Sequence, residues 1–135
     1  MSSLCLARFD ETFLVTIKDY KKVHIKPQKG TFYTVKLDGK KAGVIGFSVK
    51  EGGNYFLKIG IHQDFRGSGL FNRALGLLVR KHQIEKIYST LATTNAASIR
   101  AHIKLGFRRI PLRVEKRLRR EGLLLKRNVR MVKSF

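Results

Sequence analysis

The stretch HQDFRGSGLFNRAL, residues 62–75, joins a run of strand-forming residues to a run of helix-forming ones. A glycine-rich turn exposes backbone N–H groups, and the first turn of a following helix adds free N–H groups and partial positive charge. The turn therefore suits a phosphate or pyrophosphate, although a strand-to-helix turn also uses glycine for geometry alone. No Gly-Lys-Ser/Thr follows, which excludes a P-loop.

The residues before this turn predict strands. Two short runs near the N-terminus, CLARF (5–9) and FLVTI (13–17), favour β-structure, and lysines, Pro27 and Gly30 indicate a connection over residues 18–30. A three-stranded meander follows, with a hairpin turn at Asp38-Gly39, over residues 31–37, 42–50 and 55–61. An antiparallel meander at this place also excludes a dinucleotide-binding fold.

The residues after the turn alternate between helix and strand. Residues 70–83 carry an apolar helical stripe (Leu70, Ala74, Leu75 and Leu78), and KIYSTLA (86–92) is strand-like. A second helix is expected to start at Thr94 or Asn95 and to end at Gly106. Two strands with a turn or short helix are expected within residues 107–135. The predicted fold class is α/β (α+β): one domain, residues 1–135, with a mixed, mostly antiparallel sheet flanked by helices.

Charge is the strongest signal in the composition. The chain has 135 residues with 29 Lys and Arg against 9 Asp and Glu, a net charge of +20. Such a field attracts polyanions and repels cationic substrates. No apolar run long enough to cross a membrane is present, and the N-terminus does not resemble a secretory signal, so a cytoplasmic location is expected. The lone Cys5 predicts no disulfide and no metal site, and we expect it to be a small buried hydrophobic residue.

Two segments carry a family resemblance. IGIHQDFRGSGLF (59–71) resembles the acetyl-CoA-binding segment of the GNAT superfamily of N-acetyltransferases, whose signature is Gln/Arg-x-x-Gly-x-Gly/Ala. NAASIRAHIKLGF (95–107) resembles the second GNAT segment, and the resemblance extends over residues 31–110. It implies an enzyme, an acetyl-CoA-dependent N-acetyltransferase acting on a primary amine.

The resemblance also implies which residues bind acetyl-CoA. A bulge in the strand before the turn would free backbone groups for the pantetheine arm, the turn amides would hold the pyrophosphate, and the second helix would contribute an asparagine. The implied cofactor-binding residues are Ile59, Gly60, Ile61, Arg66, Gly67, Ser68, Gly69, Leu70, Phe71 and Asn95.

The sequence departs from the family pattern near the expected chemistry. Phe71 stands where the signature has Gly or Ala, and His102 stands where many members have a tyrosine that protonates the departing thiolate. His102 is therefore the first candidate for the general acid, His62 a candidate base or substrate contact, and Tyr88 a third proton donor. Packing roles remain open for all three, and residues 55–61 contain no carboxylate.

Two features bear on the acceptor: the positive net charge, and the short N-terminal connection before the first meander strand. Residues 19–30 are too short for the two helices that usually cover the acceptor site, so the helical region is shortened and an open groove for a macromolecule is expected. The predicted contacts to RNA, DNA or an acidic protein are Arg113, Lys116, Arg117, Arg119, Arg120, Lys126, Arg127 and Arg130. Two alternatives remain: a GNAT-fold binding module with little or no catalysis, and a small-molecule amine acetyltransferase.

Overall fold

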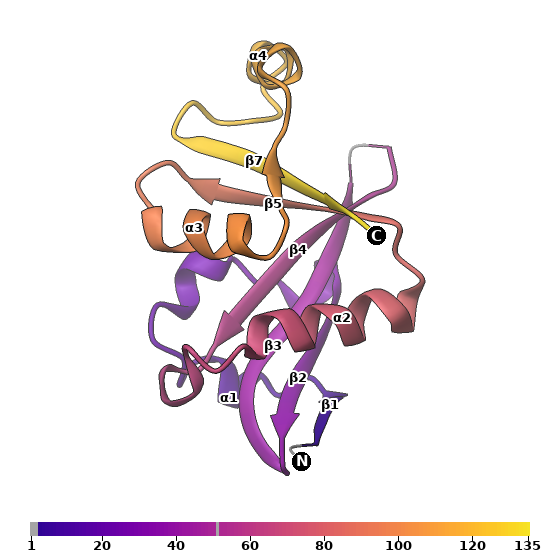
Figure 1. The fold of residues 1–135 in the computed structure, drawn as a ribbon, viewed down its shortest axis with the longest axis vertical. Coiled ribbons are helices and arrows are strands. Elements are labelled where there is room, and N and C mark those ends of the chain that lie inside the picture. Colours follow the sequence, from indigo (N-terminus) through magenta and orange to yellow (C-terminus); the bar gives the residue numbers. More distant parts are fainter. Residues whose placement is uncertain (1–2, 51) are drawn as a thin grey trace.

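The computed structural model describes residues 3–50 and 52–135, which form one seven-stranded sheet (Figure 1). The strand order is β1-β2-β3-β4-β5-β7-β6, and every neighbouring pair is antiparallel except the parallel pair β4 and β5. The strands are β1 (Leu4–Arg8), β2 (Thr31–Leu37), β3 (Lys40–Lys50), β4 (Asn54–Ile61), β5 (Lys86–Ala92), β6 (Arg108–Arg109) and β7 (Asn128–Ser134). The predicted mixed, mostly antiparallel sheet is confirmed.

The central meander forms where the residue pattern placed it. Asp38 and Gly39 both have positive φ, at 50° and 81°, as a tight hairpin turn between twisted strands requires. β2 and β5 have the predicted bounds, and the predicted bounds of β3 and β4 differ from the observed ones by one or two residues.

The N-terminal region differs from prediction in two respects. Residues 13–17 do not form a strand: Asp10 caps a short helix, α1 (Glu11–Leu14), by accepting a hydrogen bond from the Phe13 amide. The connection to β2 then contains two 3-10 helices, η1 (Tyr20–Val23) and η2 (Pro27–Lys29), so the helical region is short, as expected. Cys5 is exposed, and its predicted burial is wrong, because it lies on the face of the edge strand opposite Leu4 and Leu6, which pack against the core.

The two faces of the sheet are covered by different helices. Ile45 and Val44 are adjacent on β3 and fully buried, yet Ile45 packs in the main core with α2 (Leu70–His82), whereas Val44 packs with Leu14 and Ile17 of the N-terminal region. Successive strand residues point to opposite faces. α2 therefore covers one face, together with α3 (Ala96–Lys104), while α1 and η1 cover the other.

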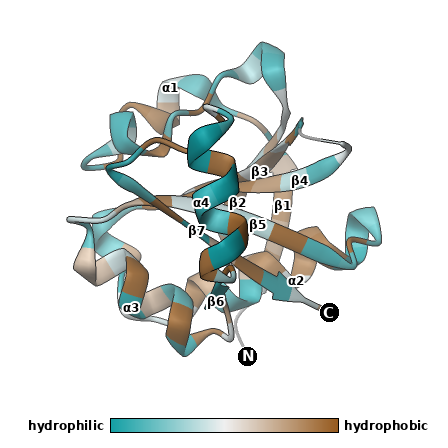
Figure 2. Cartoon of the chain, turned by 90° about the horizontal axis from the view of Figure 1, so that it is seen from above, coloured by the Kyte–Doolittle hydropathy of each residue, from teal (hydrophilic) through white to brown (hydrophobic). Residues whose placement is uncertain are grey.

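The C-terminal residues complete the sheet and add a basic helix. β7 inserts between β5 and β6, and α4 (Leu112–Arg120) connects the last two strands, which confirms the predicted short helix. In Figure 1 α4 stands at the end of the molecule farthest from the β2–β3 hairpin. Seen from above in Figure 2, α4 is mostly hydrophilic with a few apolar residues.

The described part of the chain contains neither a membrane-spanning helix nor a cluster of metal-ligating side chains. None of its helices is long and apolar enough to cross a bilayer. No group of three or more His, Cys, Asp or Glu side chains there is placed to hold a metal ion.

Candidate active site

A cavity opens where β4 and β5 separate. The two parallel strands pair only at Tyr55–Ile87 and Phe56–Tyr88, and beyond these pairs they diverge. The cavity has a volume of about 640 Å³, the size of a small-molecule site. Ile59, Gly60 and Ile61, which the family resemblance implies as cofactor-binding residues, line it.

The implied bulge in β4 is not present. β4 pairs with β3 in unbroken register from Asn54 to Ile61. The separation comes instead from the end of pairing with β5, so the backbone groups of β4 after Phe56 on that side face the cavity and not a neighbouring strand.

The glycine-rich turn lies at one end of the cavity. Gly67 and Gly69 have φ values of +79° and +76°, and Gly69 is the N-cap of α2 without a side-chain cap. A Cβ at either position would meet no atom within 4 Å, so these glycines are needed for the backbone conformation and not for close packing inside the protein. Gly67, Gly69, Leu70 and Phe71 line the cavity, and the uncapped first turn of α2 supplies N–H donors for an anion.

Arg66 and Ser68 have partly structural roles. The Arg66 guanidinium lines the cavity while it donates to the carbonyl oxygens of Ile61 (3.0 Å) and Lys18 (2.9 Å), which ties the turn to β4 and to the N-terminal region. Ser68 is not among the described lining residues, and its hydroxyl donates to the Phe65 carbonyl at 2.5 Å. The side chain of Ser68 therefore stabilises the turn.

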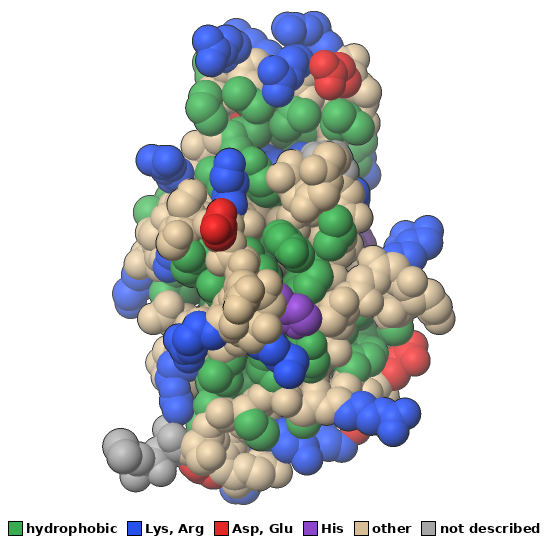
Figure 3. All heavy atoms as spheres, turned by 90° about the vertical axis from the view of Figure 1, so that its right-hand side faces the viewer, with side chains coloured by type: hydrophobic (Ala, Val, Ile, Leu, Met, Phe, Trp, Pro, Cys, Tyr) green, Lys and Arg blue, Asp and Glu red, His purple; other side chains and the backbone are tan. Residues whose placement is uncertain are grey.

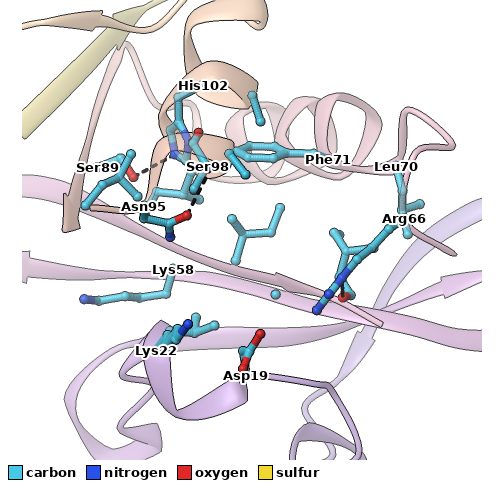
Figure 4. A pocket seen from close by; sticks show the side chains of 18 of the residues that line it. Asp19, Lys22, Lys58, Arg66, Leu70, Phe71, Ser89, Asn95, Ser98 and His102 are labelled. Atoms are coloured by element: carbon cyan, nitrogen blue, oxygen red, sulfur yellow. Dashed lines mark hydrogen bonds between the residues drawn. The ribbon is translucent and has the colours of Figure 1, made fainter. Parts of the chain in front are cut away.

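Asn95 links α3 to the cavity. Its side-chain oxygen accepts a hydrogen bond from the Ser98 amide at 3.2 Å and so caps α3, as predicted. Because the oxygen is engaged, the amide nitrogen is the donor that Asn95 can offer to a ligand. Figure 4 shows Asn95 between His102 and Lys58 on the cavity wall.

His102 lies in the cavity wall, paired with a serine. Its Nδ1 lies 2.7 Å from the Ser98 carbonyl oxygen, and its Nε2 lies 2.9 Å from the Ser89 hydroxyl (Figure 4). A carbonyl oxygen only accepts, so Nδ1 carries the proton and Nε2 of the neutral ring accepts from Ser89. Ser89 and His102 are 3% and 2% exposed, and both line the cavity.

The surroundings of His102 favour its neutral form. Burial lowers the pKa of the imidazole, and this effect exceeds the opposing one of the hydrogen bond to Ser98. The centre of the Phe71 ring lies 5.1 Å from the centre of the imidazole, in an edge-to-face arrangement. The centre of the Phe107 ring lies 4.9 Å from it in the same arrangement. Phe71 thus packs against His102 while lining the cavity, which explains the residue that departs from the family signature.

The other two predicted proton-transfer residues lie elsewhere, outside the described lining of this cavity. His62 stacks on Phe13 at 5.9 Å, and its Nδ1 accepts from the Asp64 amide at 3.1 Å. Tyr88 stacks on Phe56 at 5.5 Å, on the face of β5 opposite Ser89. The structure therefore brings only His102, of the three, to the cavity.

Ser89 was not predicted from the sequence. A signal for it was present, because strand alternation puts Ser89 on the same face as Ile87, where a polar side chain is buried and needs a hydrogen-bond partner. The partner on α3 could not be identified without knowing how α3 packs.

Comparisons with known proteins agree with this geometry. The model of the Acetyltransferase (GNAT) family matches residues 4–107, more than half of the chain. No curated protein matches the chain by sequence.

Solved structures share the fold at low identity. An IAA acetyltransferase from Bacillus cereus ATCC 14579 is similar over 100% of both chains, with a TM-score of 0.66 and 14% identity. A Bacillus subtilis acetyltransferase solved in complex with CoA is similar over 100% of this chain and 99% of its own, with a TM-score of 0.69 and 14% identity. The ribosomal-protein-S18-alanine N-acetyltransferase from Escherichia coli is similar over 99% of this chain and 94% of its own, with a TM-score of 0.63 and 15% identity. The family match over the cavity-forming segments shows that this chain belongs to the GNAT acetyltransferase family.

Proposed function

We propose that this chain transfers the acetyl group of acetyl-CoA to a primary amine of an acceptor bound to nucleic acid. The observation that carries the proposal is the buried Ser89–His102 pair in the wall of the same cavity that the first turn of α2 and Asn95 line. One cavity thus combines an anion-binding end with a proton-transfer group.

The residues present fit acetyl-CoA. The uncapped amides of α2 and the positive-φ turn at Gly67 and Gly69 would hold the pyrophosphate, and the divergent edge of β4 would pair with the pantetheine amides. The Bacillus subtilis relative in complex with CoA supports acetyl-CoA as the acyl donor. When bound, acetyl-CoA supplies a thioester whose carbonyl carbon the acceptor amine attacks.

Acetyl transfer requires a proton to leave the amine and a proton to reach the thiolate. Ser89 and His102 are arranged to carry that proton. The Ser89 hydroxyl takes the amine proton as it passes its own to Nε2 of His102, and the imidazolium then returns a proton through Ser89 to the leaving sulfur. The lowered pKa of His102 suits this route, because the neutral ring is the form that accepts.

A stripe of cations on α4 supports a nucleic-acid-bound acceptor. Residues at spacings of three, four and seven share one face of a helix, and here all four are exposed and basic: Arg113, Lys116, Arg117 and Arg120. Figure 3 shows Lys and Arg side chains gathered at the end of the molecule where α4 stands. Guanidinium groups pair with phosphate in a planar, bidentate geometry, and several cations along one face can neutralise successive phosphates, so the stripe suits a polyanion such as nucleic acid.

Two of the eight predicted contact residues have internal partners. Arg119 donates to Glu115 at 2.6 Å and to the Asn128 carbonyl at 2.8 Å. Arg130 is 6% exposed and donates to Thr90 Oγ1 at 3.2 Å. The exposed residues that remain for the polyanion are the stripe on α4 and, in the connection from α4 to β7, Lys126 and Arg127.

The test measures thiol release from acetyl-CoA with three acceptors: aminoacyl-tRNA, the same aminoacyl group on a single nucleotide, and an acidic peptide with a free amine. We expect aminoacyl-tRNA to have the highest kcat/KM and to lose this advantage as salt rises, because phosphate contacts are screened. A preference for the acidic peptide would overturn the nucleic-acid assignment. CoA binding without turnover of any amine would show a binding module and not an enzyme.

A further inference from the structure

A second cavity adjoins the first one. Its volume is about 520 Å³. Lys22, Lys58, Thr90 and Asn95 are among the residues that it shares with the first cavity, the one between β4 and β5 where acetyl-CoA is proposed to bind. Its remaining lining includes Phe56, Lys50, Arg130 and residues 123–125 of the loop after α4. A ligand in the second cavity can therefore reach the first one past Lys58.

The lining of the second cavity is strongly cationic. Four side chains carry the positive charge, and no carboxylate is among the described lining residues: Lys22, Lys50, Lys58 and Arg130. Lys58 is half-buried, and its pKa is lowered first by burial and then by Lys50, Lys26 and Arg130. Gathering like charges in a partly desolvated space costs free energy, which a bound anion would relieve.

The cationic groups are oriented by neighbouring side chains. The Arg130 guanidinium donates to Thr90 Oγ1 at 3.2 Å and to the Leu123 carbonyl at 3.4 Å, and its Cζ lies 4.7 Å from the centre of the Phe56 ring. Lys50 Nζ lies 5.7 Å from the centre of the same ring. Because Arg130 is buried and held in place, little side-chain entropy would be lost on binding a ligand.

We infer that the second cavity binds a phosphate group of the acceptor and so selects amines that carry a phosphate nearby. This inference rests on the proposed acetyl transfer and names the chemistry of its acceptor. Phosphate fits better than carboxylate, because four cations suit a group with up to two negative charges and three acceptor oxygens. The phosphate in the second cavity and the amine near Ser89 would place the acceptor across the boundary that Lys58, Thr90 and Asn95 form.

Binding of inorganic phosphate tests the site without catalysis. Saturating CoA occupies the pyrophosphate turn, and the thermal midpoint is then measured with added phosphate against chloride at equal ionic strength. We expect phosphate to raise the midpoint of the wild type and of Lys40→Met, an exposed hairpin lysine, but not that of Lys58→Met or Lys50→Met. An equal response in all four proteins, or no response in the wild type, would overturn the site. Lys50 is exposed, so its variant tests the site even where Lys58→Met does not fold.

Selectivity between matched amines tests the role of the site. The acceptors are ethanolamine, O-phosphoethanolamine and a short RNA with the same amine on its 5′-phosphate. We expect kcat/KM to be about 10-fold or more higher for the phosphorylated amines, and the difference to fall several-fold in Lys58→Met and Lys50→Met, since each 10-fold corresponds to about 1.4 kcal/mol. Preference for the RNA over O-phosphoethanolamine would identify nucleic acid as the source of the phosphate.

The failures of the two proposals are distinguishable. Acetylation of ethanolamine and O-phosphoethanolamine at equal efficiency would leave the acetyltransferase standing and overturn the phosphate site. Phosphate binding that depends on Lys58 and Lys50, with no acetylation of any amine, would leave the anion site and overturn the proposed function.

Discussion

The hydroxyl oxygen of Ser89 lies 2.9 Å from Nε2 of His102, and both side chains are almost fully buried. The other ring nitrogen, Nδ1, lies 2.7 Å from the Ser98 carbonyl oxygen. Both ring nitrogens therefore have hydrogen-bond partners, which fix the orientation of the ring. This arrangement fixes the tautomer and directs the basic nitrogen at the serine. A proton can therefore move between Ser89 and His102 without any side-chain rearrangement.

Replacing Ser89 with alanine should slow acetyl transfer. Without the hydroxyl, His102 has no route to the reacting amine and sulfur, and we expect kcat to fall by about 100-fold, within the range for general acid–base catalysis. KM for acetyl-CoA should change little, because the turn and the α2 amides are untouched. Steady-state kinetics of thiol release measure both quantities.

Ser134→Ala is the matched control for this change. Ser134 is an exposed β7 residue outside the described cavity lining, so we expect its hydroxyl to have no part in the reaction. An equal kcat for Ser89→Ala and Ser134→Ala would remove Ser89 from the mechanism.

His102 should make the stability of the protein depend on pH. Burial lowers its pKa in the folded state below the usual 6.5, so the unfolded chain binds the proton more readily. The contribution of His102 to stability is therefore complete above pH 6.5 and is lost as the pH falls from there through the folded-state pKa. Thermal midpoints at pH 7.5 and 5.0 should differ more for the wild type than for His102→Gln, and equal differences would contradict this linkage.

Local sequence patterns predicted most of the fold. The strands of the meander are short β-favouring runs bounded by turn residues, and α2 carries an apolar helical stripe, so both follow from short-range patterns. The strand predicted at residues 13–17 was wrong because Asp10 caps α1 and the chain turns after Leu14, although the residues themselves are β-formers. Local propensity was overridden there by capping and by burial of Leu14 and Ile17.

The candidate site was only partly visible in the sequence. The turn at Gly67 and Gly69 and the cap at Asn95 are local features with short spacings, and the structure brings them to one cavity. The Ser89–His102 pair depends on how α3 packs against β5, which no local pattern encodes. Likewise, Arg66 was predicted to bind the cofactor and Arg119 to contact a polyanion, but their hydrogen bonds to Ile61 and Glu115, which depend on the tertiary fold, give them structural roles as well.

Gly69→Ala should weaken CoA binding beyond its effect on stability. Alanine at φ +76° costs about 1 kcal/mol in conformational energy. Its Cβ would point into open space next to the free α2 amides, where the pyrophosphate is proposed to bind. We expect isothermal titration to show a Kd for CoA raised by about 10-fold, equivalent to about 1.4 kcal/mol.

Gly52→Ala is the control that separates the effect of backbone strain from the effect of a Cβ at the proposed CoA site. Gly52 also has a positive φ, +83°, with no atom within 4 Å of a Cβ, but it lies in the β3–β4 turn outside the described cavity lining. Both variants should lose similar thermal stability. If Gly52→Ala weakened CoA binding as much as Gly69→Ala, strain and not obstruction would be the cause.

Glu115 should contribute to acid sensitivity. Its side chain is 1% exposed and accepts two hydrogen bonds from Arg109 and one from Arg119. The hydrogen bond from Arg109, with the charges of both arginines, lowers the pKa of the carboxyl below 4.5. The stability that Glu115 contributes is present above that unfolded-state value and is lost as the pH falls through the folded-state pKa. Chemical unfolding at pH 7 and 3 should show a smaller loss for Glu115→Gln than for the wild type.

The α4 stripe should control binding to RNA. Replacing Arg113, Arg117 and Arg120 with glutamine removes three exposed cations from one helix face while leaving the Arg119–Glu115 pair intact. For every phosphate that the variant helix no longer neutralises, the slope of log K against log salt should become shallower by about 0.7 for single-stranded RNA. The matched control replaces three exposed cations elsewhere, Arg8, Lys29 and Lys40, with glutamine for the same change in net charge. A fall in affinity and slope confined to the α4 variant supports a local phosphate-binding face; equal falls in both variants would show that net charge alone attracts RNA.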